Sequence, residues 1–161
     1  MRMFTALCSA LCLLAGADVF AAGKDLSTHA ERTAFSETGR YEEVQRLCRE
    51  FAASHPKQVR CFSFGKSAEG REMMVLAANM QGVLTPEAAL AAELPVTLIQ
   101  GGIHAGEIDG KDAGFLVLRE LLENPGKDNP LNRQVLLFVP VFNVDGHERF
   151  KAFNRPNQRG P

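Results

Sequence analysis

Two side chains with clear chemical potential, His104 and Glu107, lie three residues apart in the segment Gly-Gly-Ile-His-Ala-Gly-Glu at 101–107. An imidazole and a carboxylate at this spacing can turn toward one point, and both are common zinc ligands. The glycines around them let the backbone bend and approach a ligand closely. The spacing predicts a Zn²⁺ site that uses His104 and Glu107, and a catalytic zinc would still need a third protein ligand.

A His-x-x-Glu spacing alone also occurs by chance, and its place in the fold is what gives it weight. The near-continuous apolar run at 95–100 predicts a strand that is buried on both faces. Apolar residues at 109–122 recur at helical spacing and predict a helix. His104 and Glu107 therefore follow the carboxyl end of a strand and precede a helix, where open α/β sheets place their ligand sites.

The rest of the chain predicts the other elements of an α/β domain. Apolar residues at helical spacing predict a helix at 41–54. Two segments on either side of turn-forming residues predict a hairpin of strands at 59–64 and 72–78, and an apolar run predicts a strand at 134–142 that a turn at 143–146 follows. This order predicts the α/β class with a mixed, largely parallel sheet flanked by helices, incomplete in this chain.

The first 22 residues predict a secretory signal peptide. A short positive start precedes an apolar run at 4–14 and a stretch of small residues that reaches Ala22. A transmembrane anchor is the alternative, but the run is shorter than the roughly 20 residues that cross a bilayer. We therefore expect a secreted or periplasmic protein with no stable membrane span after cleavage, in which residues 23–39 form an extended lead-in.

The charge balance argues against a nucleic-acid partner. The chain has 18 Lys and Arg residues against 19 Asp and Glu residues, a net charge of −1. Nucleic-acid binding depends on cationic side chains that neutralise phosphates. No nucleic-acid partner is expected.

Two cysteines, Cys48 and Cys61, remain after removal of the signal peptide. An even pair in an oxidising compartment is consistent with a disulfide. Two buried free thiols are the alternative, and the sequence does not decide between them.

Three motifs in the same order resemble those of the M14 zinc carboxypeptidases. The segment 102–107, Gly-Ile-His-Ala-Gly-Glu, resembles the first zinc motif of that family. The segment 64–71 resembles its Gly-x-Ser-x-Glu-Gly-Arg hairpin turn. The segment 141–146 resembles its Asn-Pro-Asp-Gly turn, with Val144 in place of the proline.

The resemblance implies that residues 40–161 form the N-terminal part of a metallopeptidase catalytic domain. It implies a zinc-dependent carboxypeptidase that acts on a peptide or peptide-like substrate, with His104 and Glu107 as metal ligands. The family's third ligand, general base and substrate-binding arginine lie further downstream and cannot be assigned here, so the chain alone is expected to be inactive. Neither Arg155 nor Arg159 has the surroundings of the substrate-binding arginine.

The remaining histidines are predicted to play no part in the metal site. His147 is predicted to be a turn or surface residue, because the family pattern places no ligand there. His29 and His55 are predicted to face solvent.

Two other classes of function stay open at this point. A zinc amidohydrolase of the aspartoacylase or succinylglutamate desuccinylase type shares a His-x-x-Glu start on a similar fold, although the turn at 67–71 favours the peptidase. The second is a non-catalytic secreted binding domain that kept the fold without the chemistry. Within the peptidase class, a carboxypeptidase, a cell-wall amidase and a γ-glutamyl hydrolase cannot be separated.

Overall fold

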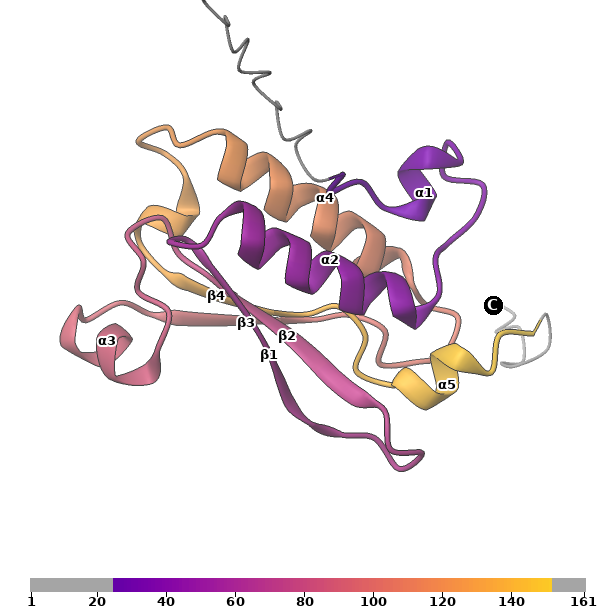
Figure 1. The fold of residues 1–161 in the computed structure, drawn as a ribbon. Helices are drawn as coiled ribbons and strands as arrows, with labels where there is room; N and C mark the ends of the chain where they lie inside the picture. The colour runs from indigo at the N-terminus through magenta and orange to yellow at the C-terminus, as the bar shows by residue number, and fades with distance from the viewer. Residues whose placement is uncertain (1–24, 152–161) are drawn as a thin grey trace, which may run out of the picture.

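A mixed four-stranded sheet forms the centre of the computed structural model, which describes residues 25–151 (Figure 1). The strands lie in the order β1-β2-β4-β3. Their bounds are Val59–Lys66 for β1, Glu72–Ala78 for β2, Val96–Gln100 for β3 and Val135–Val139 for β4. The predicted hairpin is thus confirmed as β1 and β2.

The pairing of the strands is mixed but mainly antiparallel. β1 pairs antiparallel with β2, and β2 pairs antiparallel with β4. β3 and β4 pair in parallel, as a strand-helix-strand crossover requires. The predicted mixed sheet flanked by helices is therefore confirmed. The expectation of a largely parallel sheet is wrong for the described strands, because the hairpin itself lies directly beside β4.

Two long helices pack on one face of this sheet (Figure 1). The helix α2 spans Tyr41–Ser54, as the spacing predicts, and α4 spans Asp109–Glu123. The short helices are α1 at His29–Arg32, α3 at Pro86–Ala91 and α5 at Val144–Glu148, with a 3-10 turn at Pro130–Asn132. No helix among residues 25–151 is long and apolar enough to cross a bilayer.

Aromatic contacts join the helices to the sheet. Phe115 of α4 stacks on Phe51 of α2 with ring centroids 5.7 Å apart, and it meets Phe138 of β4 edge-on at 5.3 Å. All three rings are buried. A Cβ at Gly114 would lie 2.2 Å from the Phe138 ring, so a residue without a side chain is needed where α4 crosses β4.

The strand β3 is more exposed than its apolar sequence predicts. Val96, Leu98 and Ile99 are 51, 58 and 48 % exposed. Among the described residues β3 lies at the edge of the sheet and pairs only with β4. The expectation of burial on both faces is therefore wrong for this part of the chain.

Two segments predicted to lack helix contain short helices. The lead-in holds α1, which Thr28 caps by accepting a hydrogen bond from the amide of Glu31. The turn predicted at 143–146 is the start of α5, where the Asn143 side chain accepts from the amide of Gly146. Side-chain capping stabilises the first turn of a helix in each case. The predicted signal peptide lies outside the described residues.

A disulfide between Cys48 and Cys61 joins α2 to β1. The two Cα atoms lie 5.4 Å apart, within the usual range for a disulfide. The bond ties the helix to an outer strand of the sheet, next to the buried core residue Leu47.

Candidate metal centre

The loop at 101–108 leaves β3 and leads into α4, beside the segment that follows β4. The amide of Gly101 donates to the carbonyl of Val139 at 2.8 Å. The amide of Asn143 donates to the carbonyl of Gly102 at 2.9 Å. The loop therefore starts at the carboxyl ends of two parallel strands, as the sequence predicts.

The two predicted zinc ligands meet at the tip of this loop. His104 Nδ1 and Glu107 Oε2 lie 2.8 Å apart, and the two side chains are 59 % and 56 % exposed. The amide of Glu107 also donates to the carbonyl of His104, which closes the turn between them. An imidazole nitrogen and a carboxylate oxygen thus face the same small volume, which stays open to solvent.

Glycines permit this loop conformation. Gly102 has a φ of +53°, and a Cβ there would lie 3.0 Å from the Val141 side chain. Gly106 has a φ of +85°, in the left-handed region that L-residues with side chains disfavour. The backbone conformation of the loop therefore favours glycine at positions 102 and 106.

The side-chain types of His104 and Glu107 suit zinc, but they would provide two ligands where a catalytic site uses three. Imidazole and carboxylate are both usual zinc ligands, and catalytic zinc sites use three protein ligands. Residues 25–151 contain no group of three or more His, Cys, Asp or Glu side chains placed to hold a metal. His104 and Glu107 fit part of such a site.

The hairpin turn between β1 and β2 contacts α5 through Asp145. The Ser67 hydroxyl donates to Asp145 Oδ1 at 2.7 Å, and Arg71 Nη1 donates to the same oxygen at 2.6 Å. The amide of Glu69 donates to Asp145 Oδ2 at 3.0 Å. Partial burial raises the pKa of Asp145, but these hydrogen bonds outweigh it, so the net pKa is below its ordinary value.

This contact joins two of the motifs that the sequence singles out, and sequence reasoning missed it. Arg71 and Asp145 are 74 residues apart, so no spacing rule connects them. The signal that was present is chemical: Arg71 in one turn and Asp145 in the other carry opposite charges. Arg149 extends the set by donating to Glu69 at 2.8 Å.

His147 is buried, which contradicts its prediction as a turn or surface residue. It is 3 % exposed, and both of its ring nitrogens lack a hydrogen-bond partner among the described residues. His147 lies within the helix α5, on the face whose residues Val144 and His147 are buried. Burial lowers the pKa of His147, and the nearby charge of Lys111 lowers it further.

The other histidines lie closer to their predicted surroundings. His29 and His55 are half-buried rather than fully solvent-facing, and His29 forms an ion pair with Glu37 at 2.9 Å. Arg155 and Arg159 lie outside the described residues.

Comparison with known proteins places these features in a family. The family model for zinc carboxypeptidases matches residues 44–160. Human carboxypeptidase Z is 31 % identical over 113 residues, which cover 67 % of this chain and 17 % of that protein. Mouse carboxypeptidase A6 is 29 % identical over 119 residues, 68 % of this chain and 25 % of that protein.

Solved structures agree with this assignment. Carboxypeptidase A from Helicoverpa armigera superposes with a TM-score of 0.58 at 27 % identity, over 68 % of this chain and 25 % of that one. Bovine thrombin-activatable fibrinolysis inhibitor shares the fold at a TM-score of 0.53 and 18 % identity, over 70 % of this chain and 33 % of that one. This chain thus spans a third or less of each of these relatives. With the family model matched over most of its length, the chain belongs to the zinc carboxypeptidase family.

Proposed function

We propose that His104 and Glu107 bind Zn²⁺ as two of the protein ligands of a secreted or periplasmic metallocarboxypeptidase. The observation that carries the proposal is the 2.8 Å contact between His104 Nδ1 and Glu107 Oε2 at the solvent-open tip of the loop after β3. A cation beside these two atoms would be within reach of both the imidazole nitrogen and the carboxylate oxygen. A third ligand would come from outside residues 25–151.

The chemistry proposed for the whole protein is hydrolysis at the C-terminus of a peptide. When bound, zinc would acidify a water molecule and polarise the carbonyl of the scissile bond. The role of this chain's residues is to hold the metal on a loop anchored at the end of the sheet. Membership of the zinc carboxypeptidase family supports this proposal.

The isolated chain is proposed to have no peptidase activity. Two ligands hold zinc more weakly than the three of a catalytic site, and neither a general base nor a carboxylate-binding cation is assigned among residues 25–151. The alternative of an N-acyl amino-acid hydrolase is not favoured, because the family match and the Ser67–Arg71 turn both support a peptidase.

Zinc titration tests the site directly. Zn²⁺ affinity is measured by competition with a chromophoric chelator for the wild-type chain, His104→Ala and Glu107→Gln. His55→Ala is the matched control, because His55 is a half-buried histidine at the end of α2. Each ligand variant should lose affinity about tenfold or more, while the control should match wild type. Equal affinity in all four proteins would contradict the assignment.

A further inference from the structure

A fully buried lysine lies just after the loop at 101–108, which we call the metal loop. Lys111, in the first turn of α4, is 0 % exposed. Its Nζ donates to Asp112 Oδ1 at 2.5 Å and lies 3.5 Å from Glu43 Oε2 of α2. The side chains of Glu43 and Asp112 are themselves only 9 % exposed. A buried ammonium group is tolerated only when it is paired in this way.

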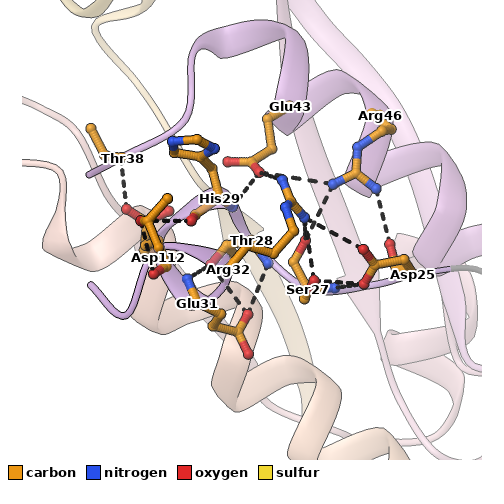
Figure 2. Close-up of polar contacts among 12 residues, drawn as sticks. Asp25, Ser27, Thr28, His29, Glu31, Arg32, Thr38, Glu43, Arg46 and Asp112 are labelled. Carbon is orange, nitrogen blue, oxygen red and sulfur yellow. Dashed lines mark hydrogen bonds and ion pairs between the residues drawn. The ribbon is translucent and has the colours of Figure 1, made fainter. Parts of the chain in front are cut away.

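Residues 25–38 complete the pairing of these charges. The Thr38 hydroxyl donates to Asp112 Oδ2 at 2.7 Å. The amide of His29 donates to Glu43 Oε1 at 2.5 Å, and Arg32 Nη2 donates to the same oxygen at 3.1 Å. Figure 2 shows the N-terminal segment in contact with Glu43 on one side and Asp112 on the other. We call Glu43, Lys111 and Asp112 the anchor cluster.

The anchor cluster adjoins the point where the metal loop closes on itself. A Cβ at Gly110 would lie 3.7 Å from the Cα of Gly101, and a Cβ at Gly101 would lie 3.4 Å from the backbone nitrogen of Lys111. The two ends of the loop therefore touch, while the His104 and Glu107 side chains at its tip are more than half exposed.

Each end of the loop has its own attachment. The Gly101 end is held by its hydrogen bond to Val139, the last residue of β4. The other end is the first turn of α4, which lacks a side-chain cap. Lys111 lies in that turn, four residues after Glu107. A buried and fully paired side chain at this position limits rotation and sliding of the turn.

We propose that Lys111, held by Glu43 and Asp112, is a positioning residue of the metal site. The anchor cluster fixes the first turn of α4 against α2 and residues 25–38, and so keeps His104 and Glu107 directed toward one point. This inference rests on the proposed zinc site for its function. Its structural part, the immobilisation of the loop, can be tested without metal.

The test measures two properties of the whole 161-residue chain. Hydrogen exchange of the amides at 103–108 reports the mobility of the loop, and chelator competition reports Zn²⁺ affinity. Lys111→Met keeps most of the length of the side chain and removes the charge. Thr38→Val removes the hydroxyl that donates to Asp112 of the anchor cluster, and it provides the test if Lys111→Met does not fold.

The matched control is Arg119→Met. Arg119 lies on the same helix, and its ion pair with Glu31 also ties α4 to residues 25–38, about three turns away from the loop. It is 20 % exposed and makes a second contact with Glu31 at 3.2 Å. If Lys111 only stabilised the fold, Lys111→Met would lower global stability, as Arg119→Met is expected to do, and would have no specific effect on the loop.

The expected result is that Lys111→Met raises loop exchange about tenfold and weakens Zn²⁺ binding about tenfold, with a smaller change in Thr38→Val. Arg119→Met should leave both properties at the wild-type level. Loop exchange in Lys111→Met or Thr38→Val that equals that of Arg119→Met would overturn the inference. If wild type binds no zinc through His104 and Glu107, the proposed function fails, and the exchange data still decide whether Lys111 immobilises the loop.

Discussion

Arg71 Nη1 donates to Asp145 Oδ1 at 2.6 Å, and this contact joins the β1–β2 hairpin turn to α5. Ser67 and the amide of Glu69 donate to the same carboxylate. One acidic side chain therefore holds the tip of the hairpin against the segment that follows β4. That segment also donates hydrogen bonds to the carbonyls of Gly101 and Gly102 in the loop at 101–108, so the contacts of Asp145 connect all three motifs.

Asp145→Asn should destabilise the fold at neutral pH. The depressed pKa means that the ionised carboxylate stabilises the native state above its ordinary value of 3.8, and that this contribution is lost as the pH falls through the native pKa. The urea midpoint of the variant should lie below that of wild type at neutral pH, and the difference should shrink in acid. Asp128→Asn, at an exposed position, is the control. A difference that does not change with pH would contradict this account.

His147 should make the fold sensitive to mild acid. Burial and the charge of Lys111 lower its pKa below the ordinary 6.5, so the unfolded state binds the proton more readily. Above the ordinary pKa of 6.5, His147 is neutral in both states and does not change the free energy of unfolding. As the pH falls from 6.5 toward the lower native pKa, the unfolded state takes up the proton and the protein loses stability. Glu148 opposes the shift, and Arg40 adds to it.

The corresponding variant is His147→Leu, compared at about pH 7 and about pH 5 in urea unfolding. It should lose less stability on acidification than wild type, because the group that takes up the proton on unfolding is gone. His55→Ala controls for removal of a histidine outside the core. An identical loss in His147→Leu and wild type would show that other groups cause the acid sensitivity.

Removal of the disulfide should cost stability without changing the fold. Cys48 and Cys61 close a loop across a sequence separation of 13, for which chain entropy predicts about 3 kcal/mol. The variant is Cys48→Ala with Cys61→Ala, compared with wild type by urea unfolding and circular dichroism. As a direct check, the unreduced chain at residues 23–161 should show no titratable thiol after denaturation. Two reactive thiols would contradict the bond.

Gly114→Ala should destabilise the protein although alanine favours a helix. Its Cβ would lie 2.2 Å from the Phe138 ring, and overpacking of this kind costs about 1–3 kcal/mol. Gly110→Ala is the matched control on the same helix, because its Cβ would make only an ordinary contact at 3.7 Å. Thermal unfolding of both variants gives the comparison, and equal midpoints would contradict the close packing of α4 on β4.

The isolated chain should not release a C-terminal amino acid from peptides. Its described residues include the two proposed zinc ligands, His104 and Glu107, and no group of three side chains placed to hold a metal. The measurement is amino-acid release from a set of peptides with added Zn²⁺, with and without a chelator. Release that the chelator abolishes and that His104→Ala also abolishes would show that the chain completes a working site by itself.

Local patterns were sufficient for the elements around the site. The helix at 41–54 follows from apolar residues at helical spacing, which line the buried face of α2. The glycines and the His-x-x-Glu spacing at 101–107 placed the candidate ligands after a strand, where the structure has them. These features depend on residues close together in the chain.

The tertiary structure decided which distant residues meet. The partners of Lys111 include Glu43, 68 residues away, and the partners of Asp145 include Arg71, 74 residues away. The inward orientation of His147 depends on the helical turn of α5, and the exposure of β3 depends on its place at the sheet edge.

Side-chain periodicity and backbone freedom within a few residues were therefore enough to predict the order of the main elements, the hairpin turn between β1 and β2, and the candidate ligand pair of His104 and Glu107. Only the tertiary structure decided the burial of Lys111, the Arg71–Asp145 contact and the burial of His147. Burial and ion pairing depend on the packing of segments that are remote in sequence, and no local spacing encodes that packing.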